Sequence, residues 1–384
     1  MVIKDICDRT INMNELGNKA RNILLLHEMG FPVAKSWIIE SNYPVSLLRI
    51  EGLYRNGVSL SDFKKVRHFF LNEISNDAKL VIYSELCNCL EPYASYAIRS
   101  SSCLEDDHEH TYAGLYTTFL NVKKKMNIIN CILKIWGDCF SEKVYEMCLL
   151  KGIKKVNPCA ILIQKMISTN IGGVALGFDN KAYICAAYGQ TKGIVDGNIA
   201  SDKWIIERNS KKVIDVQIRP KTKALYLTPY RLLNSEKGYT CICQGTEKLN
   251  VFYKLVESGR LMQVDIPKEK QCLLCIDDEQ VVRVLTLIEE VAKKIECMSY
   301  DVEWAIDNNM EIYILQIRAL TSEPQIQNLE SPNDVMPISG GKAYGMGIRV
   351  SKYKDLQRIN GESIVIAKDI NGPVLSAFSR VRGY

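Results

Sequence analysis

A β-hairpin is predicted by the segment Asp301-Val-Glu-Trp-Ala-Ile-Asp-Asn-Asn-Met-Glu-Ile-Tyr-Ile-Leu-Gln-Ile-Arg318. Its two arms, 301–306 and 311–318, are rich in β-branched and aromatic residues, which favour strands. The residues between the arms include Asn308 and Asn309, and asparagine tolerates the positive φ that a type I′ turn requires. The segment therefore predicts two antiparallel strands joined by a two-residue turn.

The two faces of this hairpin differ in chemistry, because side chains alternate between the faces of a strand. A two-residue turn sets Glu303 opposite Ile314 and Asp301 opposite Gln316. One face, which we expect in the core, carries Val302, Trp304, Tyr313, Leu315 and Ile317. The other face is polar and carries Asp301, Glu303, Gln316 and Arg318.

The polar face has two interpretations. Mg²⁺ prefers oxygen ligands and is usually held by one or two protein groups together with substrate phosphates, which fits carboxylates beside an amide. A neighbouring arginine could then bind those phosphates through two parallel hydrogen bonds. Alternatively, the face is the solvated side of an antiparallel sheet, with a cross-strand Asp–Arg pair. Periodicity alone leaves both open.

A second polar cluster lies far upstream, where Arg99-Ser-Ser-Ser102 follows a predicted strand at 96–99. It precedes the acidic run at 105–107 and leads to Gly114 and Thr118. A loop of glycine and small hydroxyl residues lets backbone N–H groups approach a phosphate closely. Taken by itself, the cluster could equally be a polar loop that joins two strands.

The rest of the chain alternates between helical and strand patterns. Apolar residues at helical spacing predict helices at about 15–29, 61–75, 127–150 and from 277 to 295. Short apolar or β-branched runs predict strands at 160–167, 173–178 and 182–187. Helices alternating with antiparallel segments predict an α+β protein.

Composition excludes several classes of protein. The chain has 384 residues, of which 47% are hydrophobic and 24% charged, so it is not disordered, collagenous or a coiled coil. The net charge of +5 is too small over this length to indicate nucleic-acid binding. No apolar run reaches the ~18 residues of a membrane span, and residues 1–12 are too charged for a signal peptide. We expect a soluble, cytoplasmic protein of two or three domains, with neither nucleic acid nor a membrane as partner.

The fourteen cysteines do not indicate a disulfide framework. Many lie inside apolar runs, where a free cysteine behaves as a small hydrophobic residue. Cys272 and Cys275 have the spacing of zinc ligands, but a second pair of that spacing is missing, since Cys241 and Cys243 are separated by one residue. We therefore expect these cysteines to be reduced and to pack in the core.

Several motifs follow one another between positions 16 and 321: Leu16-Gly-Asn-Lys-Ala20 with Gly30-Phe-Pro-Val33, Ala97-Ile-Arg-Ser-Ser101 with Glu105-Asp106, Ala113-Gly114 with Thr118-Phe-Leu-Asn-Val122, Ile163-Gln-Lys-Met166 with Gly173-Val174, Asp301-Val-Glu-Trp-Ala305, and Leu315-Gln-Ile-Arg318 with Thr321. In this order they resemble the N-terminal nucleotide-binding domain shared by phosphoenolpyruvate synthase, pyruvate phosphate dikinase and rifampin phosphotransferase. Each motif is short, but their common order is specific.

This resemblance implies an α+β, ATP-grasp-like fold of two lobes that close on ATP and Mg²⁺. Position by position, it implies that phosphate oxygens are bound by Lys19, Arg99 and Arg318. It also implies that the loop over the phosphates contains Gly114 and Thr118 and that Gln164 lies by the adenosine. The Mg²⁺ ion would be held by Glu303 and Gln316. Arg99 and Arg318 would be the catalytic residues, because phosphoryl transfer depends on neutralising the charge of the transferring group. The predicted Mg²⁺ ligands belong to the polar face of the hairpin.

Two departures from the family pattern affect this interpretation. The family's GLGE segment appears as Gly189-Gln-Thr-Lys192, which replaces a carboxylate with a cation and puts contacts with the nucleobase or ribose in doubt. The family's Arg-Pro after the last motif appears as Arg318-Ala319, which affects only the geometry of the loop.

The C-terminal part resembles the start of the family's swivelling domain, whose phosphate-carrying histidine lies beyond this point. The predicted division is a first lobe at 1–190, a second lobe at 191–321, a linker at 322–339 and a partial swivelling domain at 340–384. The four histidines, His27, His68, His108 and His110, lie outside the histidine motif. We therefore expect the acceptor histidine in a further C-terminal portion, either in cis and deleted here or in trans.

The leading hypothesis is the ATP-binding portion of a phosphotransferase that passes the β-phosphoryl group of ATP to a histidine and then to a small acceptor such as pyruvate. Only the first half-reaction would belong to this chain. Two alternatives remain open: a stand-alone ATP-grasp-type kinase or ligase acting on a small molecule, and a nucleotide-binding regulatory module without turnover.

Overall fold

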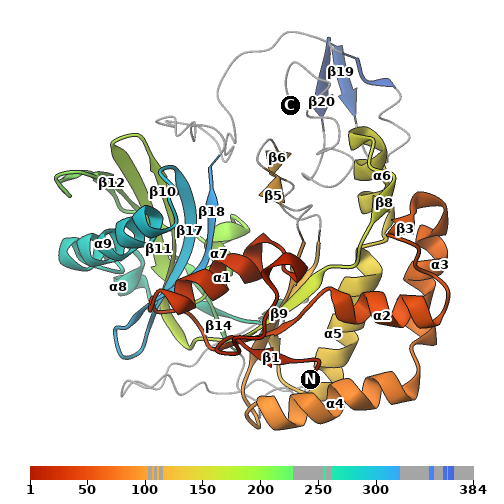
Figure 1. The fold of residues 1–384 in the computed structure, drawn as a ribbon. Helices are drawn as coiled ribbons and strands as arrows, with labels where there is room; N and C mark the ends of the chain where they lie inside the picture. Colours follow the sequence, from red (N-terminus) through yellow and green to blue (C-terminus); the bar gives the residue numbers. More distant parts are fainter. Residues whose placement is uncertain are drawn as a thin grey trace.

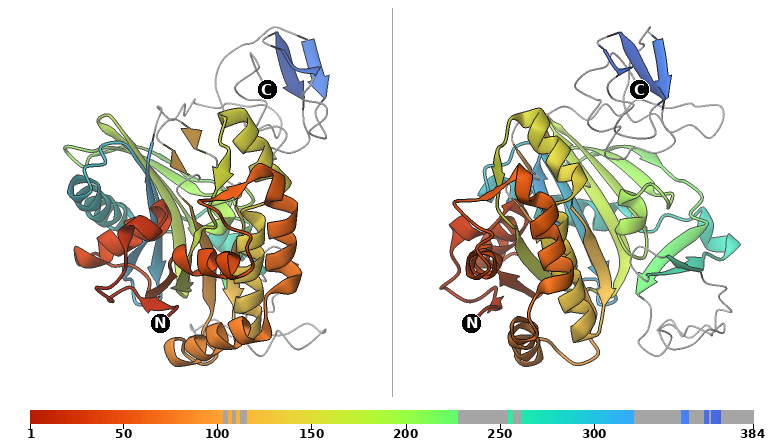
Figure 2. Two further views of the ribbon diagram at one scale, coloured as in Figure 1. Left: turned by 45° about the vertical axis from the view of Figure 1, so that its right-hand side comes forward. Right: turned by 90° about the vertical axis from the view of Figure 1, so that its right-hand side faces the viewer.

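The computed structural model describes residues 1–102, 106–107, 110–111, 116–227, 254–256, 261–320, 346–349, 358–360 and 362–366. Two antiparallel sheets form the centre, and each is covered by helices on its outer side (Figure 1). The left view of Figure 2 again places α9 (Asp278–Lys294) and the helices of the first sheet on opposite sides of the molecule. The predicted α+β, two-lobed architecture is confirmed.

The first sheet has five strands in the order β1 (Lys4–Asp5), β2 (Ser36–Ile39), β9 (Ala160–Lys165), β4 (Tyr96–Ser101) and β7 (Thr118–Val122). Its outer side packs against α2 (Asn42–Ile50), α3 (Phe63–His68), α4 (Asn76–Cys89), α5 (Lys125–Asp138) and α6 (Glu142–Lys151). Tyr96 and Ile98 of β4 lie in this core. Ala97 and Arg99, which follow them in the strand, therefore face the second sheet.

The second sheet has six strands in the order β13 (Val213–Gln217), β12 (Asp202–Glu207), β11 (Lys181–Tyr188), β10 (Thr169–Phe178), β17 (Tyr300–Asp307) and β18 (Ile312–Ala319). Trp204, Val302 and Trp304 pack against the apolar face of α9. This helix begins with a capping box between Asp277 and Gln280, at the position where the sequence predicts its start.

Smaller elements complete the described chain. A three-stranded sheet contains β14 (Lys223–Leu227), β16 (Leu261–Asp265) and β15 (Lys254–Val256). Short pairs are formed by β3 (Val58–Ser59) with β8 (Lys155–Val156), β5 (Asp106–Asp107) with β6 (His110–Thr111), and β19 (Met346–Arg349) with β20 (Ser363–Ile366). Two further short helices are α7 (Lys192–Val195) and α8 (Lys268–Gln271). In the described part of the chain, every helix is too short or too polar to cross a lipid bilayer.

The helix α1 (Asn18–Glu28) contacts both sheets. Ile23 and Leu24 pack with residues of β2 and β9, whereas Leu26 belongs to the core of the second sheet. The side chain of Asn22 donates a hydrogen bond to the backbone oxygen of Ile317 in β18 at 2.9 Å. The N-terminal segment therefore joins the two lobes on one side.

The hairpin β17–β18 forms, but its predicted register is wrong. The turn contains three residues, because the backbone N–H of Asp307 bonds to the oxygen of Glu311 and Met310 adopts φ +64°. A bulge then inserts Leu315, so Glu303 lies opposite Gln316 and Asp301 opposite Arg318. The one-residue shift at the turn and the extra residue at the bulge compensate, and the polar side chains keep a common face. Leu315 itself lines a pocket and does not lie in the core.

Two other expectations differ from the structure. The single helix expected at 127–150 is two helices, α5 and α6, separated at 139–141. The strands β10 and β11, which precede position 190, pair into the second sheet. The chain therefore passes from the first sheet to the second at 166–168, earlier than the first-lobe boundary at 190 that we expected. Residues 322–339, the expected linker, and most of 340–384 lie outside the described residues.

Candidate functional site

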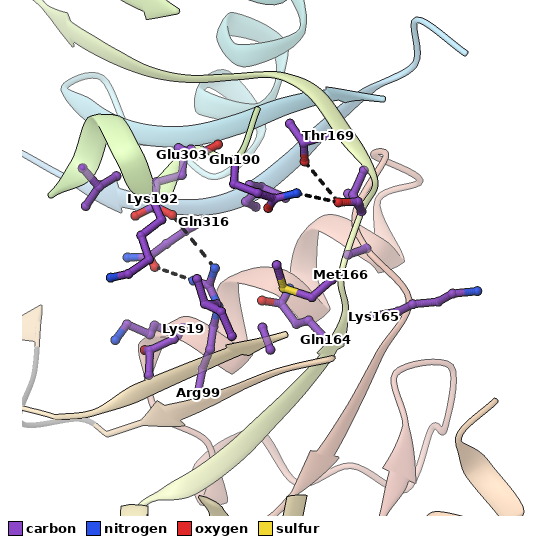
Figure 3. Close-up of a pocket in the computed structure, with 18 of the residues that line it drawn as sticks. Lys19, Arg99, Gln164, Lys165, Met166, Thr169, Gln190, Lys192, Glu303 and Gln316 are labelled. Carbon is purple, nitrogen blue, oxygen red and sulfur yellow. Dashed lines mark hydrogen bonds and ion pairs between the residues drawn. The ribbon is translucent and has the colours of Figure 1, made fainter. Parts of the chain in front are cut away.

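A cavity of ≈ 330 Å³ lies between the two sheets (Figure 3). Every described residue of the predicted site lines it: Lys19, Arg99, Thr118, Gln164, Glu303, Gln316 and Arg318. Gly114 lies outside the described residues. The structure thus brings together side chains that are up to 299 positions apart in the sequence, from Lys19 to Arg318, in one cleft. Their individual roles remain predictions.

Arg99 of β4 reaches across the cleft to the second sheet. Its Nη1 donates a hydrogen bond to Oε1 of Gln316 at 3.1 Å, and its Nη2 lies 4.0 Å from Oε2 of Glu303. Glu303 and Gln316 are direct cross-strand partners on β17 and β18. A cation from one lobe is therefore held by two oxygen-bearing side chains of the other.

Arg318 and Asp301 form a cross-strand ion pair at the edge of the cavity. Nε and Nη2 of Arg318 lie 2.7 Å and 2.5 Å from the same Oδ2 atom of Asp301. The sequence places Asp301 on the polar face of the hairpin. In the structure, Asp301 is the ion-pair partner that orients Arg318.

Lys19 is brought to the cavity by close packing between α1 and the end of β4. A Cβ on Gly17, which caps α1, would lie 2.2 Å from the carbonyl carbon of Ser101. The backbone N–H of Ala20 donates to Oγ of Ser101 at 2.9 Å. Only glycine permits this approach, which places the positive end of the helix dipole beside the end of β4.

The connection between the sheets forms another wall of the cavity. Gln164 is only 4% exposed, and its Nε2 is buried without a hydrogen-bond partner among the described residues. The backbone oxygen of Ile167 accepts hydrogen bonds from Nε2 of Gln190 at 2.9 Å and from Oγ1 of Thr169 at 3.2 Å. The wall therefore holds one carbonyl through two hydrogen bonds and contains one buried amide donor without a partner among the described residues.

The sequence did not assign pocket positions to Met166, Thr169, Gln190 and Thr191. The glycines of β10 were one feature of the sequence that could have indicated close packing of another segment against this strand. A Cβ on Gly172 would lie 2.5 Å from the backbone nitrogen of Thr191, so this glycine lets the segment at 189–192 pack onto the sheet. Lys192, in the same segment, lines the cavity and pairs with Asp196 at 2.9 Å.

In Figure 3, Lys19, Arg99, Lys192, Glu303 and Gln316 lie toward one side of the pocket, whereas Gln164, Met166 and Thr169 lie toward the other. Lys165 points its amino group away and pairs with Glu91 at 2.6 Å. The cavity thus has a mainly cationic side, suited to a polyphosphate, and a less charged side that contains the buried amide.

Mg²⁺ and ATP fit this donor set. The oxygens of Glu303 and Gln316 already hold a cationic group, the Arg99 guanidinium. Among the described residues, no group of three or more His, Cys, Asp or Glu side chains is placed to hold a metal ion. Mg²⁺ is commonly held by one or two protein oxygens together with the phosphates of a nucleotide.

The other candidate groups lie away from this cavity. The described cysteines are free thiols, and burial together with the neighbouring Asp202 raises the pKa of the Cys275 thiol. Cys241 and Cys243 lie outside the described residues. His27 lies 3.2 Å from Sγ of Cys7, and His68 is exposed beside Glu73. His108 and the side chain of His110 are outside the described part.

Comparison with known proteins gives the family. The family model described as the pyruvate phosphate dikinase AMP/ATP-binding domain matches residues 13–237 and 234–337. A probable phosphoenolpyruvate synthase of Archaeoglobus fulgidus is 26% identical over 275 residues, which cover 70% of this chain and 32% of that protein. An uncharacterized phosphotransferase of Bacillus subtilis is 24% identical over 319 residues, covering 80% of this chain and 34% of the relative. The chain therefore spans about a third of the length of these curated relatives.

Solved structures are similar only loosely. The D-alanyl-alanine synthetase A of Vibrio cholerae matches with a TM-score of 0.30 and 9% identity, over 78% of this chain and 56% of that chain. Family membership rests on the sequence match, which extends over most of the chain and contains every described residue of the cavity. The chain belongs to the family of the pyruvate phosphate dikinase AMP/ATP-binding domain.

Proposed function

We propose that the cavity binds Mg·ATP and performs the first half-reaction of a phosphoenolpyruvate synthase-like phosphotransferase. In this proposal the β-phosphoryl group of ATP passes to a histidine that is carried by another portion or another chain, AMP leaves, and the γ-phosphoryl group is transferred to water and released as phosphate. A small-molecule acceptor then receives it. The observation that carries the proposal is the meeting of Arg99 with Glu303 and Gln316 across the cleft.

The chain's own residues would perform the positioning. Lys19, Arg99 and Arg318 would bind phosphate oxygens and neutralise charge on the transferring group, while Glu303 and Gln316 would hold Mg²⁺. The bound metal would polarise the phosphate oxygens. Thr118, with Gly114, would contact the phosphates, and Gln164 would donate its buried amide to the base. The closed cleft would exclude water from the phosphates.

The family match and the chemistry of the cavity support nucleotide binding, and the names of the relatives support phosphoryl transfer. The identity of the final acceptor would depend on the portion that carries the histidine.

The test uses ATP labelled separately at the β- and γ-positions. Calorimetry first measures Mg·ATP binding by the chain. The histidine-bearing portion of a phosphoenolpyruvate synthase is then added, and we expect acid-labile, base-stable label from β-labelled ATP on that portion. Rapid turnover by the isolated chain with a small molecule would instead favour a stand-alone kinase or ligase. Binding without transfer to any acceptor would favour a regulatory module.

A further inference from the structure

Arg99 occupies the oxygens that the proposed function assigns to the metal. Its guanidinium is hydrogen-bonded to Oε1 of Gln316 at 3.1 Å and lies 4.0 Å from Oε2 of Glu303. The side chains of Arg99 and Glu303 are only 13% and 23% exposed, so solvent screens this charge only partly. A cation of the protein itself therefore contacts both side chains that the proposed function assigns to the metal.

A divalent ion bound by Gln316 and Glu303 would compete with Arg99, which is hydrogen-bonded to one of these side chains and lies beside the other. A dication held by Glu303 and Gln316 would lie within a few ångströms of the guanidinium charge, and like charges at that distance repel strongly at a partly buried site. The oxygen of Gln316 would also have to give up its hydrogen bond. Arg99 must therefore move toward another anion before the metal can bind well.

We propose that Arg99 acts as a stand-in for the metal and controls the order of binding. This inference rests on the proposed function. The triphosphate offers Arg99 stronger acceptors than Gln316, since hydrogen bonds from arginine to phosphate are charge-assisted on both sides. The guanidinium then leaves Glu303 and Gln316, and the divalent ion enters together with the nucleotide. Without nucleotide, the site excludes the metal. Arg99 is here a positioning residue for the metal site as well as a phosphate ligand.

The experiment measures Mn²⁺ binding without nucleotide, by electron paramagnetic resonance of the free ion. We expect weak binding by the wild-type chain and at least about tenfold tighter binding by Arg99→Gln, which removes one charge next to the ligands. Arg99→Gln/Glu303→Gln should lose this gain, because the carboxylate is gone. Arg99→Lys keeps a positive charge and should retain the weak binding.

Lys165→Gln is the matched control, since Lys165 lines the same cavity but pairs outward with Glu91. An equal gain in Lys165→Gln would overturn the inference, because it would reflect the net charge of the cavity. Mn²⁺ affinity in Arg99→Gln no higher than in the wild type would also overturn it. Far-UV circular dichroism checks that each variant is folded.

The proposed function is tested separately by calorimetry of the wild-type chain with ATP and Mn²⁺ together. Binding of Mn·ATP with no gain in Arg99→Gln would reject only the stand-in role. Absence of Mn·ATP binding would reject the site itself.

Discussion

Gly17 and Ser101 are in backbone contact, and a Cβ on Gly17 would lie 2.2 Å from the carbonyl carbon of Ser101. This contact fixes the start of α1, with Lys19, against the end of β4, with Arg99. The two cations are therefore positioned by one glycine, whose replacement must move either a helix or a strand.

Gly17→Ala should lower both stability and nucleotide affinity. Overpacking in a well-packed region costs about 1–3 kcal/mol of unfolding free energy. Gly52→Ala is the control, because Gly52 has open space and only its φ of +67° opposes alanine. Urea unfolding gives the stabilities, and calorimetry with Mg·ATP gives the affinities. Gly52→Ala should leave affinity unchanged; an equal loss of affinity in both variants would disprove the local effect.

Arg99→Ala and Glu303→Ala should each weaken Mg·ATP binding while leaving far-UV circular dichroism unchanged. Loss of a hydrogen bond to a charged group costs about 1.5–3 kcal/mol, or about 10- to 100-fold in affinity. Isothermal titration calorimetry measures the effect, and Lys165→Ala serves as the control. Wild-type affinity in both site variants would reject the site.

Gln164→Met should have opposite effects on the free protein and on its complex. Nε2 of Gln164 is buried without a partner in the described structure, and an unsatisfied buried polar group costs about 1–3 kcal/mol. Methionine of similar shape removes this penalty, so the melting temperature of the free protein should not fall. ATP affinity should fall by about tenfold, corresponding to one lost hydrogen bond. An unchanged affinity would show that the amide does not contact the nucleotide.

Lys192→Glu should weaken binding of ATP and GTP to the same extent. Lys192 lies toward the side of the cavity that holds Lys19 and Glu303, so reversing its charge repels the phosphates that both nucleotides share. Lys192→Gln separates loss of charge from reversal and should have the smaller effect. Competition binding gives the ATP-to-GTP affinity ratio. A changed ratio would assign Lys192 to the base or ribose, as the family pattern suggested.

The sequence predicts much of the site from two sources. Alternation along the hairpin places Glu303, Gln316 and Arg318 on one polar face, and they line the cavity. The resemblance of the short motifs assigns Arg99 and Gln164 to the same site, and they also line the cavity. The cap of α9 at Asp277 is equally local and was also predictable.

The features that the sequence did not predict depend on tertiary contacts, which a pattern along the chain does not contain. The bulge at Leu315 restores the polar face after a longer turn, and neither feature has a residue signature in Asn308-Asn-Met310. Gln190 reaches Ile167 only because β10 and β11 bring positions 23 residues apart together. Such tertiary pairings decide which residues wall the pocket.

Asp202, at the start of β12, and Lys221, in the segment between β13 and β14, form a fully buried ion pair at 2.5 Å. Asp202 also accepts hydrogen bonds from the backbone N–H groups of Arg219 and Cys275. Lys221→Met should destabilise the protein by about 3–5 kcal/mol, because it leaves a buried carboxylate without its cation. Asp202→Asn/Lys221→Met should recover much of that loss, since a neutral amide needs no counter-charge. Urea unfolding of the single and double variants measures the coupling. If the loss of unfolding free energy in the double variant equals the sum of the losses in the two single variants, the two charges act independently. The pair would then not link β12 to the following segment.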